Sequence, residues 1–114
     1  MSKVRWRIRL SGQAKKDIAG ILTRTAGIFG GQQAAIYQTT IVEALAELEF
    51  GLDVPVSAAR DEIRPNLRSL HVARNGRRGR HIVFYSAAPS RIVEVERILH
   101  DAMDFARHFP IVQS

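Results

Sequence analysis

The fold is decided by two neighbouring stretches of sequence, Arg78-Gly-Arg-His-Ile-Val-Phe-Tyr85 and Arg91-Ile-Val-Glu-Val-Glu-Arg-Ile-Leu-His100. In the second stretch, branched apolar residues alternate with Glu94 and Glu96, as in a strand that buries one face. The connection between the stretches, Ser86-Ala-Ala-Pro-Ser90, is short and contains a proline. Two β-rich runs joined by a few turn residues are typical of an antiparallel hairpin. We therefore predict that this hairpin forms the centre of a sheet on which the rest of the chain packs.

The 114 residues are enough for one domain with its own core, so we predict a single domain over residues 1–114. The chain has no cysteine, which excludes disulfide bonds, thiolate metal sites and a cysteine nucleophile. No run comes near the roughly 20 apolar residues that span a membrane. Basic residues also interrupt the N-terminal run where a signal peptide would need its apolar segment. We predict a cytoplasmic protein with no membrane partner.

The chain carries a net charge of +6, most of it from arginine. This balance favours an anionic partner, which could be nucleic acid, an anionic assembly such as a ribosome, or an acidic protein. The planar guanidinium group pairs with phosphate and with carboxylate alike. Charge alone therefore leaves nucleic-acid and protein partners open.

The N-terminal half predicts one strand and two helices. Val4 to Leu10 alternates apolar residues with arginines, which either keep an exposed face solvated or form a cationic functional face. Ser11 is placed to cap the helix that follows, and Gly30-Gly31 ends it. A second amphipathic helix starts directly afterwards, so the pair is interpreted as a helical hairpin. The apolar stripes of the two helices, which end at Phe29 and Leu52, are predicted to face the core.

The rest of the chain is predicted to add strands and a final helix. Asp53–Asn66 contains two prolines and is interpreted as a surface connection with one helical turn. Leu67–Arg74 is predicted as a strand, which the turn signal Asn75-Gly76 joins to the central hairpin. The strand from Arg91 is expected to end near Ile98, and a short helix to run from His100 to Phe109. The predicted fold class is α+β, a two-layer β-α-α-β-β-β-α domain with a helical hairpin packed on a small, mainly antiparallel sheet.

Several of these segments resemble a known family. The run from Arg91 to Asp104, followed by Arg107-His108, resembles the C-terminal signature of the ParE branch of the RelE/ParE toxins. Glu62–Arg68 is similar to the second-strand entry of that branch, Arg80–Tyr85 to its third strand, and Gly31–Ala34 to its helical junction. Asn66 stands where the family often has glycine, and Ser86 where it often has arginine. The order and spacing of the matching segments make the resemblance specific over roughly Arg7 to Phe109.

The resemblance implies the toxin of a type II toxin–antitoxin system, which causes growth arrest. Toxins of the ParE branch inhibit DNA gyrase by binding it, without catalytic residues or a cofactor. A cognate antitoxin, ParD-like or similar, neutralises them by wrapping an extended C-terminal segment around the sheet and the helical hairpin. Toxins of the RelE branch instead cut mRNA in the ribosome, and this activity is the alternative.

Two sets of residues follow from the charge pattern together with the resemblance. The acidic antitoxin segment is expected on the arginine-rich sheet face and on the basic turn, with contacts to Arg5, Arg7, Arg74, Arg78, Arg80 and Tyr85. The target is expected on the final segment, at Arg97, His100, Asp104, Arg107 and His108.

A ribonuclease without a metal would need a base, an acid and cations around the scissile phosphate. Arginines are plentiful, and His71, His81 and His100 are the candidates for proton transfer, although a lone histidine on a strand is more often structural. His100, Asp104 and His108 would share one face of the final helix. Their span of about 12 Å along that helix is too long for three ligands of one metal, so we predict no metal site.

A nucleic-acid binder without catalysis would need aromatic side chains interleaved with the basic ones. Only Phe84 and Tyr85 adjoin the basic turn. Neighbours on a strand point to opposite faces, so one of the two is predicted to lie in the core. Direct nucleic-acid binding is therefore the weaker interpretation.

Overall fold

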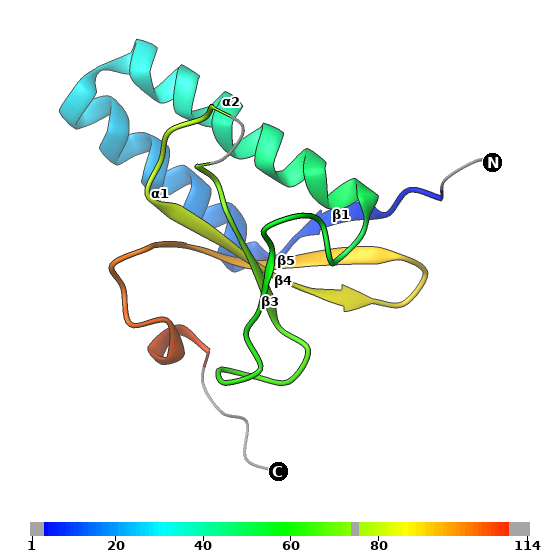
Figure 1. Ribbon diagram of the computed structural model, residues 1–114. Helices are drawn as coiled ribbons and strands as arrows, with labels where there is room; N and C mark the ends of the chain where they lie inside the picture. The colour runs from blue at the N-terminus through cyan, green and yellow to red at the C-terminus, as the bar shows by residue number, and fades with distance from the viewer. Residues whose placement is uncertain (1–3, 74–75, 110–114) are drawn as a thin grey trace.

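A five-stranded mixed sheet with two helices on one face forms the fold in the computed structural model, which describes residues 4–73 and 76–109 (Figure 1). In chain order the elements are β1 (Arg7–Leu10), α1 (Gly12–Phe29), α2 (Gly31–Glu47), the 3₁₀ turn η1 (Leu48–Phe50), β2 (Ala58–Ala59), β3 (Arg68–His71), β4 (His81–Ala88), β5 (Ile92–His100) and the 3₁₀ turn η2 (Phe105–His108). The predicted α+β class is confirmed. The predicted turn residue Asn75 and the antitoxin candidate Arg74 lie outside the described residues.

The strands lie in the order β1-β5-β4-β3-β2, so the predicted β4–β5 hairpin is at the centre of the sheet. The pairs from β2 to β5 are antiparallel, whereas β1 runs parallel to β5 with Arg7 opposite Ile92. The register of the hairpin shifts between Phe84 and Tyr85, which leaves Glu96 of β5 as the extra residue of a β-bulge. The prediction of a mainly antiparallel sheet is therefore correct, and β1 is the one parallel strand among the described residues.

Local sequence signals set the ends of the helices. The Ser11 hydroxyl accepts a hydrogen bond from the Ala14 N–H at 2.9 Å and donates one to the Glu96 carbonyl at 2.8 Å, so one side chain caps α1 and ties it to β5. Gly30 has a φ of 95°, which glycine adopts without steric cost, and it separates the two helices. The predicted helical hairpin is confirmed. Neither helix in the described part of the chain combines the length and apolar composition that would be required to cross a membrane.

Both faces of the sheet are covered. In the view of Figure 1 the two helices lie above the sheet and η2 lies below it. Tyr85 points to the helix side, where it is fully buried and donates a hydrogen bond to the Leu52 carbonyl at 2.6 Å. Phe84 points to the outer side and is also fully buried, in a second cluster with Leu99 and Phe109. The sequence predicted that one of these two aromatic residues lies in the core. Both do, because the outer face of the sheet has a core of its own.

The C-terminal segment differs from the prediction. Instead of a helix from His100 to Phe109, β5 continues through His100, which pairs with His81, and only the single turn η2 follows. Cross-strand pairing keeps this part of the chain extended. The rings of Phe105 and Phe109 then pack on Phe84, with centroids 5.0 and 5.3 Å from it, and hold the turn against the outer face.

Candidate protein-binding groove

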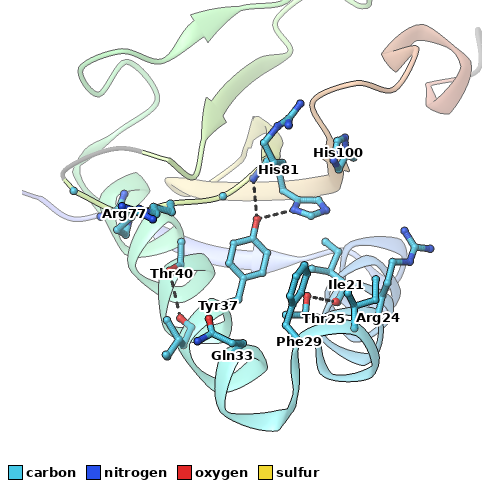
Figure 2. A pocket seen from close by; sticks show the side chains of 16 residues that line it. Ile21, Arg24, Thr25, Phe29, Gln33, Tyr37, Thr40, Arg77, His81 and His100 are labelled. Carbon is cyan, nitrogen blue, oxygen red and sulfur yellow. Dashed lines mark hydrogen bonds between the residues drawn. The ribbon is translucent and has the colours of Figure 1, made fainter.

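A groove of about 650 Å³ lies between the helical hairpin and the basic segment Gly76–Arg80, which we call the basic loop (Figure 2). Side chains of α1 and α2 form one wall, and the basic loop forms the other together with His81 and His100 from the ends of β4 and β5. The predicted strand pairing places these ends side by side, since His81 lies directly opposite His100. The groove is therefore assembled from three separate parts of the sequence: the helical hairpin, the basic loop with the start of β4, and the end of β5.

The helical wall of the groove is apolar and open to solvent. Ile28, Phe29 and Ile36 are 66%, 68% and 53% exposed, and all three line the groove near the junction of the two helices. Phe29 was predicted to face the core, and that prediction is wrong because the last turn of α1 lies beyond the sheet that would cover it. Exposed apolar side chains gathered in one groove are typical of a protein-binding surface.

Both sides of the groove also carry cations. Arg24 of α1 and Arg78 of the basic loop both line the groove, and neither guanidinium has a hydrogen bond or ion pair within the described part of the chain. Arg77 is held by Glu47 at 2.5 Å, and Arg80 is held by Asp101 at 2.9 Å. Arg77 and Arg80 are therefore fixed in place, whereas Arg78 of the basic loop and Arg24 of the helical wall remain available for an anionic ligand.

Tyr37 and two histidines lie together at the end of the groove (Figure 2). The Tyr37 hydroxyl lies 2.6 Å from Nδ1 of His81 and accepts a hydrogen bond from the Arg80 N–H at 3.3 Å. The ring of His100 stands edge-on to His81, with centroids 5.3 Å apart. Burial lowers the pKa of His81 to about 4, and the neighbouring His100 adds to the shift, so His81 is neutral at physiological pH.

Asp101 joins the ends of three neighbouring segments beside this cluster. Its carboxylate accepts hydrogen bonds from Nε of Arg80 at 3.0 Å and pairs with Nε2 of His71 at 3.1 Å. These bonds, the one from Arg80 first, hold the pKa of the Asp101 carboxyl well below its usual range. The carboxylate therefore stays ionised and keeps Arg80 occupied.

The structure brings only part of the predicted antitoxin set together. Arg78 and Arg80 lie at the groove, but Arg7 lies opposite Ile92 at the other end of β5, about 26 Å away for a strand of this length. Arg5 is at that end too, where it contacts Glu49 and Phe50. Tyr85 is buried among core residues and contributes no surface.

The predicted target set is spread over three places. Both nitrogens of the Arg97 fork bind Asp17 of α1 at 2.9 Å, which leaves Arg97 little exposed. His100 lines the groove, whereas His108 lines a smaller pocket on the outer face. Asp104 and Arg107 are exposed, next to or within η2. These five residues therefore do not form one continuous surface.

The three histidines proposed for proton transfer do come together, at the ends of β3, β4 and β5. Each uses its Nδ1 in a local hydrogen bond: His71 to the Ala73 N–H, His100 to the Ala102 N–H, and His81 to Tyr37. Nε2 of His81 and of His100 makes no hydrogen bond within the described residues, and both rings line the groove together with arginines. Among the described residues, no three histidine, aspartate or glutamate side chains are grouped so as to hold a metal ion.

Sequence reasoning missed Arg24, Ile28 and Tyr37 as groove residues. Tyr37 was placed on the core-facing stripe of α2, and Arg24 was described only as a surface residue of α1. The available signal was the length of α1, because an 18-residue helix of about 27 Å extends well past a short strand such as β1. The part of the hairpin beyond the sheet must either stay exposed or receive a partner.

Comparisons with known proteins agree with this architecture. The family model described as "ParE toxin of type II toxin-antitoxin system, parDE" matches residues 8–105. The curated protein Toxin ParE1 from Caulobacter vibrioides is 35% identical over 100 residues, which cover 88% of this chain and 94% of that protein. A solved structure described as the chromosomal ParDE TA system from P. aeruginosa has the same fold, with a TM-score of 0.67 at 18% identity, and the match covers 87% of this chain and 98% of that one.

Proposed function

Because the chain belongs to the ParE toxin family of type II toxin–antitoxin systems, we propose that it arrests growth by binding DNA gyrase and that a cognate antitoxin neutralises it. In this proposal the toxin acts in the cytoplasm by protein–protein binding, without a cofactor. The antitoxin is the partner of the groove between the helical hairpin and the basic loop.

The single observation that carries the antitoxin assignment is the pairing of an apolar wall with two arginines that have no partner within residues 4–73 and 76–109. Ile28, Phe29 and Ile36 offer a surface for the apolar face of an amphipathic segment, and Arg24 and Arg78 offer charges for its acidic residues. Segments that bind in this way combine apolar anchors for affinity with charges that fix their register. Arg5 and Arg7 would be reached only by an antitoxin segment that continues about 26 Å along the sheet.

Charge reversal in the groove tests the antitoxin assignment. We expect Arg24→Glu and Arg78→Glu each to weaken binding of the cognate antitoxin at least about tenfold, since each places a like charge against the acidic segment. Lys16→Glu is the matched control, because Lys16 is an exposed cation on α1 that does not line the groove. The measurement is titration calorimetry with the purified pair. Equal affinities for all three variants and the wild type would remove the groove from the antitoxin interface.

Gyrase rather than mRNA is proposed as the target because two of the three candidate acid–base groups are committed to structural bonds. The neutral His81 is hydrogen-bonded to Tyr37, and His71 is bound to Asp101. The first assay is therefore supercoiling and DNA cleavage by purified gyrase with antitoxin-free toxin. Loss of supercoiling with accumulation of cleaved DNA is the expected result.

The second candidate function is mRNA cleavage in the ribosome, as in the RelE branch. It is favoured by one observation, the grouping of His71, His81 and His100 near the arginines of the groove. If gyrase activity is unchanged, translating ribosomes become the next substrate to assay, and His100→Ala would be expected to abolish cleavage.

Asp104 and Arg107 are proposed as target contacts, because they are the members of the predicted target set that are clearly exposed. We expect Arg107→Glu to reduce growth arrest while antitoxin affinity stays within about threefold of wild type, as is usual for a charge far from the interface. Loss of both activities together would instead indicate that η2 belongs to the antitoxin surface.

A further inference from the structure

Two side chains of α2 hold the basic loop: Glu47 binds Arg77, and Tyr37 binds the backbone at the far end of the loop. The Tyr37 hydroxyl accepts a hydrogen bond from the Arg80 N–H at 3.3 Å, and it lies 2.6 Å from Nδ1 of His81 (Figure 2). Neutral His81 can accept the hydroxyl proton at Nδ1 in the tautomer that carries its own proton on Nε2, and we assign this tautomer. One side chain therefore binds both the backbone of the loop and the first residue of β4.

The loop also passes directly over the Tyr37 ring. A Cβ atom added at Gly79 would lie 2.7 Å from Cε1 and from the hydroxyl oxygen of Tyr37, and 2.7 Å from Cγ2 of Val72. Real Cβ contacts do not reach this distance, so only glycine allows the backbone to lie against the ring. Tyr37 thus fixes both the distance of the loop backbone from α2 and the path that the backbone takes.

The neighbours of Arg78 are fixed as well. Arg77 binds Glu47 at 2.5 Å and donates to the Val72 carbonyl at 3.2 Å, and Arg80 binds Asp101. Arg78, which lies between them, has no hydrogen bond or ion pair within the described residues and lines the groove. A backbone held on both sides presents this one guanidinium to a ligand without itself needing to be ordered on binding.

We propose that Tyr37 is the positioning residue of the groove, holding the basic loop so that Arg78 meets an acidic side chain of the bound antitoxin segment. The proposal rests on the proposed function, since the antitoxin is the ligand. Tyr37 acts through Arg78, and its hydroxyl is the group that matters, because the phenyl ring alone cannot bond to Arg80 or His81.

The state of His81 is consistent with this arrangement. His100, Asp101, Arg24 and His71 are the charged or titratable groups that act on His81, besides the Tyr37 hydroxyl itself. Burial, followed by His100, lowers the pKa of His81 to about 4, so the ring is neutral at neutral pH and has one nitrogen free to accept the Tyr37 proton.

Tyr37→Phe in the full chain tests the proposal, because the substitution keeps the ring and removes only the hydroxyl. We expect antitoxin affinity to fall about tenfold and amide hydrogen exchange at Gly79 and Arg80 to become faster. We also expect the pKa of His81, followed by NMR, to rise, because a donor to its neutral form is lost. In a double-mutant cycle, Arg78→Ala should cost less in the Tyr37→Phe background than in wild type.

Substitution of the acceptor gives an independent check. His81→Leu should reproduce the loss of affinity, whereas His81→Gln, whose side-chain oxygen can accept from Tyr37, should restore most of it. If Tyr37 only stabilised the fold, its substitution would lower the melting temperature, and the effects of Tyr37→Phe and Arg78→Ala on affinity would be additive.

The outcomes separate the two proposals. If the wild type binds antitoxin and Tyr37→Phe binds it equally well, with an additive cycle and unchanged exchange at the loop, the role of Tyr37 is overturned while the proposed function stands. If the wild type does not bind the antitoxin at all, the proposed function fails, and the role of Tyr37 fails with it.

Discussion

Val56 adopts a backbone conformation that is unfavourable for a branched side chain. It has a φ of 60° in the turn that the Ser57 N–H closes on the Val54 carbonyl at 3.0 Å, and its side chain is 76% exposed. Turns of this kind favour glycine or asparagine at that position, because a Cβ atom with two branches crowds the neighbouring carbonyl. The valine side chain is not buried, so no packing energy offsets the strain.

Val56→Gly is therefore expected to raise the free energy of unfolding by about 1 kcal/mol, measured by urea denaturation. Ala87→Gly is the matched control, since Ala87 is also exposed but lies within β4, where glycine should cost about 1 kcal/mol. If neither substitution raises the free energy of unfolding, or if both do, the turn conformation of Val56 is not strained.

The neutral state of His81 makes stability depend on pH. The pKa of His81 is about 4 in the folded chain, against about 6.5 when unfolded. Between these values the unfolded chain binds more protons than the folded one, so stability is full above about pH 6.5 and falls as the pH drops toward 4. His81 is only partly buried, so we expect a loss of about 1–2 kcal/mol after allowing for solvent screening.

The measurement is the free energy of unfolding at pH 7 and at pH 5, for wild type and for His81→Gln. Glutamine does not titrate, so the variant should show a smaller decrease between the two pH values. A decrease of the same size in the variant would assign the pH dependence to other groups.

At the scale of elements, α1 is joined to the free edge of β5 by Asp17. Its carboxylate accepts two hydrogen bonds from Arg97 and one from the Ile98 N–H, all at 2.9 Å. β1 ends at Leu10, so beyond that point β5 has no strand neighbour on this side, and α1 supplies the acceptor instead.

Asp17→Ala is expected to lower the free energy of unfolding by about 3 kcal/mol, because it leaves a mostly buried guanidinium and a backbone N–H without partners. Glu94→Ala is the comparison, because it removes the partner of Arg9 in an ion pair that is more exposed than that of Asp17 and Arg97. This substitution should cost about 1 kcal/mol or less. Comparable losses from the two substitutions in thermal denaturation would contradict a special role for the helix–strand join.

The β4–β5 hairpin was predictable because its signals are local: the alternation around Glu94 and the short connection are both visible within about twenty residues. The parallel pairing of β1 was not, since Arg9 and its partner Glu94 are 85 positions apart and an alternating strand does not identify its neighbour. The groove was missed for a similar reason. Phe29 has helical spacing like any core residue, and only the relative lengths of α1 and the sheet leave it uncovered.

At the scale of the whole molecule, a chain of net charge +6 should attract an acidic partner before contact. We expect the association rate with the antitoxin to fall roughly tenfold or more between about 20 and 500 mM salt, while the dissociation rate changes much less. Stopped-flow or surface-based kinetics would measure both rates. An association rate that is insensitive to salt would mean that the apolar wall, and not the arginines, governs encounter.

The parallel pairing of β1 with β5 also bears on how the protein is made. Among the described strands, the first to leave the ribosome has the last as its sheet neighbour, and the Ser11 side chain that caps α1 also binds the carbonyl of Glu96 in that last strand. Contacts this distant in sequence form late in folding. The ends of β4 and β5, which complete the groove, also meet only when the C-terminal segment has emerged. A nascent chain therefore lacks the complete groove until β5 has emerged.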